Sequence, residues 1–279
     1  MRFFLFLISP LPLMPAKTAI RKLAAVLPIK LFTSYKVTLT NIQLSFSYLN
    51  ETETLKLAKE SYIESLCSLY ETLYTLSRSP KAISKNILRV DNKYLFSEPL
   101  KADNGLILSG IHNRSVDMLL FWINSQTPTV GVYKPLKNRL LDIHVKKQRE
   151  QLGSKIFTTS YKGVKELFKA ISKNKVIIMA SDQVPQDGMG EYVNFFGRKA
   201  YTTTLVPSLA NKTSKPLVFI GLFSAEKNSL KISFTKSPKE ISAETMNLTM
   251  QKMISKNPKD YSWEYKRFKK PPTDLKNPY

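Results

Sequence analysis

Short apolar runs and amphipathic segments alternate through the middle of the chain. Brief runs of mostly apolar residues bounded by turn residues are typical of buried strands, and apolar residues that recur every three or four positions indicate helices. The predicted strands cover 105–111, 129–133, 155–159, 175–182, 216–223 and 230–236, and the predicted helices cover 116–123, 137–152, 162–172, 202–213 and 243–257. Because strands alternate with helices, we expect an α/β fold with a mixed central sheet flanked by helices.

The longest predicted helix covers residues 50–79. Asn50 is expected to cap its first turn, and Glu53, three residues later, completes a capping-box pattern. An apolar stripe then runs along the helix until Pro80 closes it. Such a stripe indicates a helix that packs one face on the core.

The first 34 residues differ in character from the rest. Residues 3–16 carry no charge and contain three prolines, and this stretch is shorter than the roughly 20 apolar residues that a membrane-spanning helix needs. A basic amphipathic stretch follows at 17–31, where Pro28 predicts a kink. Apolar and basic residues together are typical of a segment lying in the interface of an anionic membrane. We therefore predict a membrane-associating helical segment at 1–34 and a single domain at 35–279. The alternative for the first segment is a helix that packs on the core.

The chain carries a formal net charge of +22. Such an excess predicts an anionic partner, which is a membrane lipid, an acidic carrier protein or a nucleic acid, unless lysine is simply abundant throughout the source proteome. The basic residues are spread along the chain, and no nucleic-acid-binding module is recognisable. A nucleic acid is therefore not the partner that we expect.

Several kinds of site lack a sequence signature. Cys67 is the only cysteine, which excludes an intramolecular disulfide and a cysteine-based zinc site, and its apolar surroundings predict a buried core residue. The glycines form neither of the common phosphate-binding loops. His144, one of two histidines, lies among basic residues, a poor setting for a divalent cation. We expect neither a metal nor a bound cofactor.

His112 is the strongest candidate for chemistry. It directly follows the predicted strand 105–111, and Asp117 falls in the first turn of the next helix, which Ser115 is expected to cap. In open α/β sheets, ligands bind at the carboxyl ends of the strands. A carboxylate on one imidazole nitrogen would fix the tautomer and leave the other nitrogen as a general base for a hydroxyl. The spacing alone is weak, and the alternative is a helix-capping aspartate beside a loop histidine.

No G-x-S-x-G motif accompanies this histidine. We therefore expect a substrate hydroxyl to attack directly, rather than through a covalent enzyme intermediate.

Four stretches, in this order, resemble the late lipid A biosynthesis acyltransferases of the lauroyl/myristoyl type, a branch of the lysophospholipid acyltransferase superfamily. They are GIHNRSVDMLLFWI at 110–123, VGVYKPLKNRLLDIHVKKQREQLG at 130–153, ASDQVPQDGMGEYVNFFGRKAYTTTLVPSLA at 180–210 and NPKDYSWEYKRFKKPP at 257–272. The earlier stretch TNIQLSFSYLNETETLKLAKESYIES, at 40–65, is similar to the segment before that family's first long helix. The resemblance covers roughly residues 35–270.

The resemblance implies roles for individual residues. His112 matches the family's catalytic histidine and Asp117 its acidic partner. Lys134 stands where the family commonly has arginine. Lysine keeps the positive charge but cannot donate the two parallel hydrogen bonds of a guanidinium. The residues that the resemblance places in substrate binding are Lys134, Arg149, Asp182, Gln183, Phe196, Gly197 and Arg267.

The resemblance also implies an activity. We expect a membrane-associated enzyme that transfers a fatty acyl chain from a thioester, on acyl carrier protein or coenzyme A, to a hydroxyl of a lipid A precursor, with His112 as a general base oriented by Asp117. The implied location is the cytoplasmic face of a bacterial inner membrane.

Other functions remain open at this point. Asp117 stands where many lipid A members have glutamate and glycerolipid acyltransferases have aspartate, so the alternative acceptor is a lysophospholipid or another lipid. Outside acyl transfer, the alternatives are a non-catalytic protein of the same fold and a basic protein that binds membranes or nucleic acid.

Overall fold

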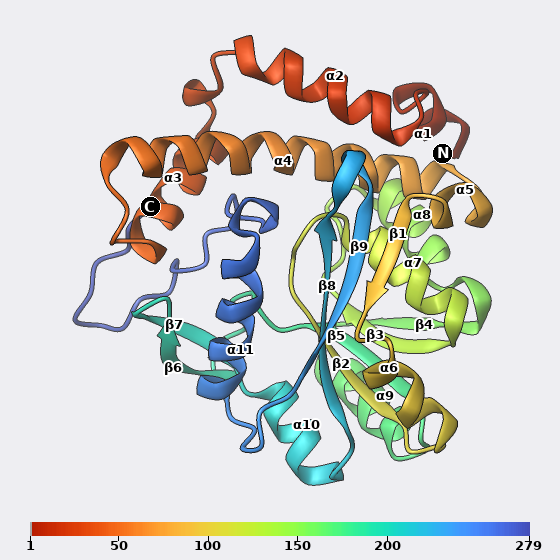
Figure 1. Ribbon diagram of the computed structural model, residues 1–279. Coiled ribbons are helices and arrows are strands. Elements are labelled where there is room, and N and C mark those ends of the chain that lie inside the picture. Colours follow the sequence, from red (N-terminus) through yellow and green to blue (C-terminus); the bar gives the residue numbers. More distant parts are fainter. Residues whose placement is uncertain (1) are drawn as a thin grey trace.

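The centre of the molecule is a twisted sheet of seven strands (Figure 1). The computed structural model describes residues 2–279. The strands lie in the order β1-β9-β8-β2-β5-β3-β4. Their bounds are β1 Ile87–Asp91, β2 Leu106–Gly110, β3 Thr129–Tyr133, β4 Lys155–Thr158, β5 Val176–Ala180, β8 Leu217–Ser224 and β9 Leu230–Lys236.

Most of this sheet is parallel. β2 pairs in parallel with β5 and β8, and β3 pairs in parallel with β5 and β4. β9 runs antiparallel to β8, and β1 runs parallel to β9. The predicted mixed α/β sheet is confirmed, and the carboxyl ends of β2, β3, β5 and β8 share one edge.

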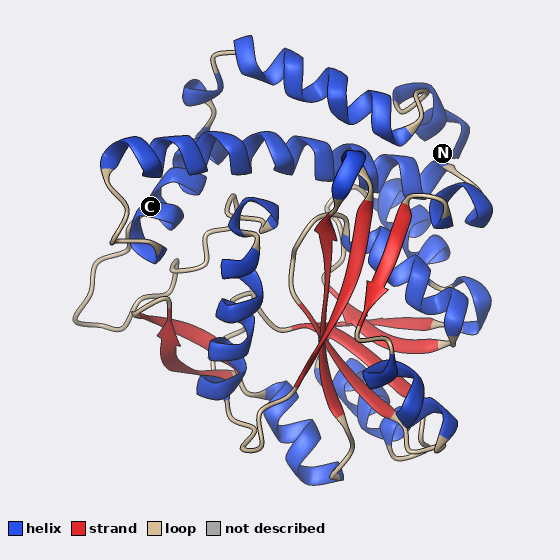
Figure 2. Ribbon diagram, in the orientation of Figure 1, coloured by secondary structure: helices blue, strands red, loops and turns tan. Residues whose placement is uncertain are grey.

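Helices cover both faces of the sheet (Figure 2). Ile107 of β2 joins the apolar core under α9, α10 and α11, whereas its neighbours Leu106 and Leu108 join the core under α6 and α7. This alternation explains why the strand reads as a continuous apolar run. The helices are α1 Arg2–Ile8, α2 Leu13–Val26, α3 Thr33–Ser45, α4 Glu51–Ser77, α5 Pro80–Ser84, α6 Tyr94–Lys101, α7 Val116–Gln126, α8 Arg139–Arg149, α9 Tyr161–Ile171, α10 Leu205–Thr213 and α11 Ala243–Lys256.

The predicted capping box at the start of α4 is confirmed. The Asn50 side chain accepts the Glu53 backbone N–H at 2.9 Å, and the Glu53 carboxylate accepts the Asn50 backbone N–H at 3.0 Å. Two of the orphan donors at the helix start are thereby satisfied. α4, the longest helix, runs across the top of the sheet in Figure 1.

The N-terminal helices pack on α4 (Figure 1). α2 ends at Val26, just before Pro28, and buries Leu13 and Lys17, whereas Leu23 is 60% exposed. Within residues 2–279, we find no helix with both the length and the apolar character needed to cross a membrane. The division of the chain at residue 34 stays a prediction, but the segment before it is in contact with the core.

The strands β6 (Gly190–Phe195) and β7 (Arg198–Thr203) form a separate antiparallel hairpin. The predicted helix at 202–213 is wrong at its start, because Thr202 and Thr203 belong to β7 and α10 begins after them. Phe196 and Gly197 form the turn, with φ angles of 53° and 74°. Positive φ at both turn positions matches the right-handed twist of a two-residue hairpin.

Cys67 lies in the interface between α4 and α2. It is fully buried, as predicted, and its Sγ is 3.8 Å from the Lys17 carbonyl oxygen. Burial raises the pKa of this thiol to about 11. The side chain therefore stays protonated and acts as a small core residue.

Candidate active site

His112 and Asp182 leave neighbouring parallel strands at the same edge of the sheet. β2 and β5 are paired through Gly110 and Ala180, and each of the two side chains follows two residues later. Asp182 Oδ1 lies 2.7 Å from His112 Nδ1, and Asp182 Oδ2 accepts the His112 backbone N–H at 2.9 Å. One carboxylate therefore holds both the imidazole and the loop that carries it.

The second ring nitrogen of His112 faces Gln183. Gln183 Nε2 lies 3.2 Å from His112 Nε2, and 26% of the His112 side chain is exposed. When Nδ1–H donates to Asp182, Nε2 carries the lone pair and accepts from the Gln183 amide. Nε2 is therefore the ring nitrogen that can act as a base.

Two opposing effects act on the pKa of His112. Burial lowers it, but the Asp182 carboxylate outweighs burial and raises the pKa of the ring above 6.5. At Asp182, burial favours the neutral acid, but pairing with His112 prevails and holds the pKa of the carboxyl below 3.8. The site therefore stabilises the imidazolium that forms when the ring accepts a proton.

Asp117, the expected partner of His112, is held by a different residue. Arg149 donates to it twice, from Nε to Oδ1 at 2.6 Å and from Nη2 to Oδ2 at 3.1 Å. The carboxylate on the ring is Asp182, which corrects the expected pairing. The reason is topological: Asp182 leaves the strand that is paired with β2, whereas Asp117 lies in α7, within reach of the arginine that ends α8.

A buried charge network holds the loop that follows His112. Its members are Lys17 and Arg21 of α2, Glu64 and Glu71 of α4, Arg114 of the loop, and Asp260. Arg114 has a φ of 53°, and its guanidinium contacts all three carboxylates. Lys17 Nζ lies 2.9 Å from Glu71 Oε1, and neither side chain is exposed. Three cations face three carboxylates, so the buried charge is balanced.

Residues 258–268 cross the site from the C-terminal side. The Ser262 N–H donates to the His112 carbonyl oxygen at 2.9 Å. Tyr261 is buried, and burial and the nearby Asp182 carboxylate raise the pKa of its hydroxyl well above 10. The Tyr261 hydroxyl therefore stays protonated, and this segment is hydrogen-bonded to the loop that carries His112.

Two of the expected substrate-binding residues are cationic groups on the flank of the site. Lys134 is exposed on the loop after β3. The positive charge of Arg149 lowers the pKa of His112 slightly, whereas the Asp182 carboxylate raises it by more. Together with Gln183 beside the ring, they remain candidates for contact with substrate.

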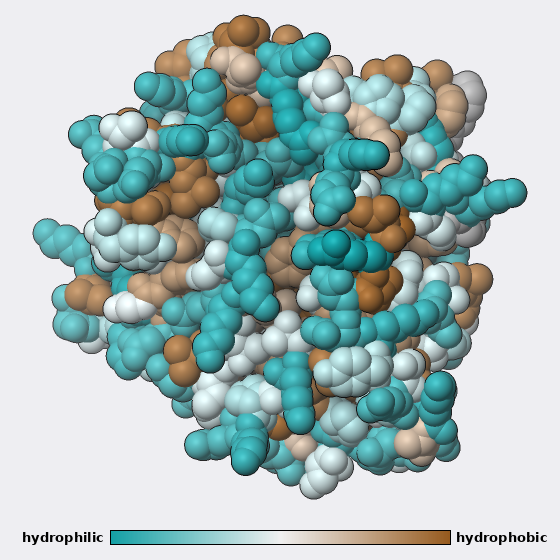
Figure 3. Space-filling model, in the orientation of Figure 1, coloured by the Kyte–Doolittle hydropathy of each residue, from teal (hydrophilic) through white to brown (hydrophobic). Residues whose placement is uncertain are grey.

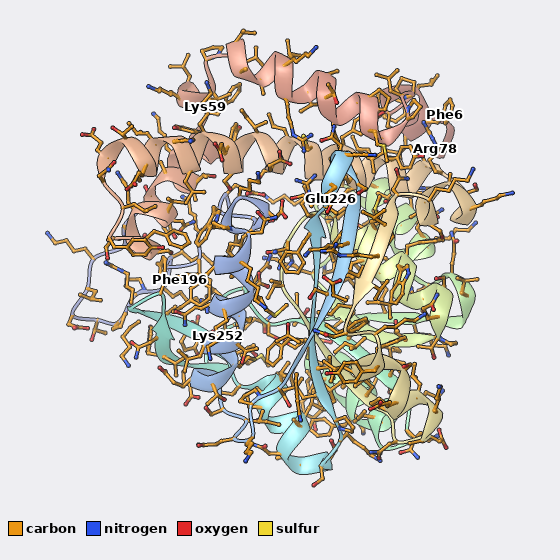
Figure 4. The ribbon with its side chains drawn as sticks, in the orientation of Figure 1. Phe6, Lys59, Arg78, Phe196, Glu226 and Lys252 are labelled. Atoms are coloured by element: carbon orange, nitrogen blue, oxygen red, sulfur yellow. The ribbon has the colours of Figure 1, made fainter. Side chains whose placement is uncertain are left out.

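The other three lie in structural positions. Phe196 and Gly197 form the β6–β7 turn, and the Phe196 ring packs 5.1 Å from Phe46, measured between centroids (Figure 4). Arg267 is 1% exposed and donates to the Tyr201 carbonyl oxygen at 2.8 Å and to Thr202 Oγ1 at 2.7 Å. Arg267 thus ties the C-terminal segment to the hairpin, and its role in binding substrate stays a prediction.

Sequence reasoning missed Arg114 and Tyr261. Both lie inside the family-like stretches, but an arginine after a histidine and a tyrosine near a tryptophan have no spacing that marks them. Only the fold brings them to His112 and Asp182. Across residues 2–279, no three His, Cys, Asp or Glu side chains gather as metal ligands would.

Comparisons with known proteins identify the family of this chain. Residues 1–270 match the family described as bacterial lipid A biosynthesis acyltransferase. The chain is 25% identical over 253 residues to the lipid A biosynthesis lauroyltransferase of Escherichia coli, an alignment that covers 88% of this chain and 82% of that protein. It is 27% identical over 250 residues to the lipid A biosynthesis acyltransferase of Haemophilus influenzae, covering 85% and 78%. The expected resemblance is confirmed over nearly the whole chain: this protein is an acyltransferase and belongs to the bacterial lipid A biosynthesis acyltransferase family.

Proposed function

We propose that this protein moves a fatty acyl chain from a thioester to a hydroxyl of a lipid A precursor, with His112 as the general base and Asp182 as the carboxylate that orients it. The observation that carries the proposal is the 2.7 Å contact between His112 Nδ1 and Asp182 Oδ1, on a histidine whose side chain is 26% exposed. This is the geometry that a histidine needs to take a proton from a hydroxyl.

The proton and the acyl group follow a simple cycle. Nε2 of His112 takes the hydroxyl proton as the substrate oxygen attacks the thioester carbonyl carbon. The tetrahedral oxyanion then collapses, the carbon–sulfur bond breaks, and the new ester remains on the lipid. The imidazolium returns its proton to the departing thiolate, which leaves as a thiol. Asp182 stays ionised throughout and stabilises the charged ring.

The flanking cations support binding of an anionic acceptor. Lys134 lies on the loop after β3, and Arg149 is the last residue of α8. Lipid A precursors of the expected kind are phosphorylated. A guanidinium already oriented by Asp117 loses little freedom when it contacts a second anion. We assign Arg149 first and Lys134 second to this contact.

The charge of +22 supports two further parts of the proposal. An acidic acyl carrier protein is the donor that such a surface favours over coenzyme A, and an anionic membrane is the surface on which the enzyme works. The corresponding location is the cytoplasmic face of a bacterial inner membrane. The exposed apolar side chains of α1 and α2 are consistent with that location.

Lipid mass spectrometry tests the function. Cells that carry the wild-type protein, His112→Ala or His144→Ala are compared, with lipid A and phospholipids analysed separately. We expect one added acyl mass on lipid A in the wild type, its loss in His112→Ala, and its retention in His144→Ala. His144 is the matched control because it is the chain's other histidine and its Nε2 lies 3.3 Å from the Leu76 carbonyl oxygen of α4, not against His112 or Asp182.

Two other outcomes are informative. Acyl transfer confined to phospholipids would move the acceptor to a lysophospholipid, the alternative suggested by aspartate at position 117. Acylation of lipid A that persists in His112→Ala would remove the general base from the proposal while leaving the family assignment intact.

A further inference from the structure

α8 exposes apolar side chains that the core does not use. Leu140 and Ile143 are 69% and 55% exposed, and Leu136 in the preceding loop is 43% exposed. The other side of the same helix packs inward through Leu141 and Val145. Single exposed leucines are ordinary, but three within eight residues, on a helix that already has a buried face, form a patch that needs a partner.

The backbone holds this patch in a fixed position. The Asp142 carboxylate accepts the Leu136 N–H at 2.8 Å, and the Asn138 side chain accepts the Leu141 N–H at 3.0 Å as the helix cap. Leu136 is therefore anchored beside the first turn of α8. Its exposure is a property of an ordered surface, not of a loose loop.

α1 lies near α8 and also exposes apolar side chains. Leu5 of α1, Leu76 of α4 and Val145 of α8 belong to one buried cluster, which brings the two helices close together. On its outer side α1 exposes Phe4 and Leu7, which are 58% and 57% exposed. Apolar residues gather along this upper edge of the molecule over α1 and α2 (Figure 3).

Basic residues flank the apolar side chains of α8, and one lies against α1. Near α1, the Arg78 guanidinium lies 4.1 Å from the centre of the Phe6 ring (Figure 4). An acidic protein would match these charges but would leave the leucines in water, whereas an anionic bilayer matches both. The exposed cations of the α8 segment are Lys137, Arg139, Lys146 and Lys147.

The patch also lies beside the active site. α8 begins just after β3, whose carboxyl end shares an edge with those of β2 and β5, and it ends at Arg149, which binds Asp117. We infer that the outer face of α8, with Leu136, Leu140 and Ile143 at its centre, is a second membrane-contact surface, and that it acts with α1 to hold the enzyme on an anionic bilayer. This inference rests on the membrane association in the proposed function and names a contact outside the N-terminal segment.

Vesicle flotation tests this surface. The full-length protein is mixed with phosphatidylcholine vesicles that contain or lack phosphatidylglycerol, and the bound fraction gives a partition coefficient. The test variant is Leu140→Glu/Ile143→Glu, Leu7→Glu probes α1, and Leu248→Glu is the matched control because Leu248 is 45% exposed on α11. Acyl transfer with detergent-dispersed substrates is measured in parallel.

We expect the α8 variant to lower binding to anionic vesicles by at least ~10-fold, with transfer in detergent kept within about twofold. The Leu140→Ser/Ile143→Ser variant, which adds no charge, should lose binding in the same direction. Unchanged partition of both α8 variants, or an equal loss in Leu248→Glu, would overturn the inference. A wild type that binds through α8 but transfers no acyl chain would instead overturn the proposed function and leave this surface standing.

Discussion

The carboxylate of Asp182 holds His112 at two points. It contacts the His112 ring through one oxygen and the His112 backbone N–H through the other. A carboxylate bound by two donors of the same residue stays ionised and keeps a fixed orientation. The tautomer and the orientation of the proposed base are therefore set by one residue, which lies 70 positions away in the sequence.

Asp182→Asn should lower kcat/KM by about 10²–10⁴-fold, because it removes the charge that orients and stabilises the imidazolium. The pH dependence should change as well. The base acts as neutral imidazole, so wild-type activity rises with pH through the raised pKa of His112. Without Asp182, burial is the remaining large effect and it lowers that pKa, so the midpoint of the kcat/KM profile should move to lower pH.

Asp117→Asn is the control for this profile. Asp117 is bound by Arg149, so its substitution should leave the midpoint near its wild-type value even where activity falls. An unshifted midpoint in Asp182→Asn would show that a different group governs the base.

The sequence identifies the base but not its partner. His112 directly follows an apolar run, and that position alone predicts a strand end in an α/β sheet. The partner depends on which strand lies next to β2, and periodicity carries no information on strand order. Nearness in the chain favoured Asp117, while pairing of β2 with β5 brings Asp182 to the ring.

At the scale of elements, α4 carries the largest share of the architecture. It supports α2, and it supplies Glu64 and Glu71 to the charge network that joins α2 to the loop after His112. Its start is defined by side-chain hydrogen bonds rather than by burial, since Asn50 and Glu53 are exposed. The position of both carboxylates along the helix therefore depends on a cap at its surface.

Asn50→Ala should lower the free energy of unfolding by about 1 kcal/mol, the usual cost of losing a side-chain cap. Chemical denaturation at neutral pH measures it. Lys56→Ala, at an exposed site in the same helix, is the control and should change the value by less than about 0.5 kcal/mol. Equal effects at both positions would mean that the capping box adds nothing to stability.

Among the strands, the continuously buried ones were predicted, whereas β1 and the β6–β7 hairpin were missed. β2, β5 and β8 are almost fully buried and read as apolar runs. β1 and the β6–β7 hairpin have mixed or exposed residues along their length, so no apolar run marks them. Their pairing depends on partners far away in the chain or on a turn, which local periodicity cannot show.

At the scale of the whole molecule, the charge network joins the N-terminal helix to the loop of the active site. Lys17 and Arg114 share the same carboxylate, Glu71, although they come from opposite ends of this assembly. A segment attached only to a membrane would have no reason to bury a lysine in the core. Deleting the first residues would leave Glu71 without one of its cations, so truncation tests folding as much as membrane binding.

Lys17→Met should lower the free energy of unfolding by about 3–5 kcal/mol, because removing one member of a buried ion pair leaves an uncompensated charge. Thermal or chemical denaturation measures the change. Lys22→Met is the matched control: Lys22 is exposed on the same helix, and its loss should cost less than about 0.5 kcal/mol. Comparable stability of Lys17→Met and wild type would show that the buried Lys17 charge does not stabilise the fold.

The lone thiol gives this molecule an internal reporter. Cys67 is the only cysteine in the chain and is sealed beneath α2, so an alkylating reagent meets it only when that helix lifts from α4 or the whole protein unfolds. The rate at which the reagent modifies Cys67 therefore measures how often α2 separates from α4, and no engineered probe is needed. If contact with a bilayer pulls α2 outward, modification will accelerate in the presence of vesicles; if α2 stays clamped while its outer face meets lipid, it will slow.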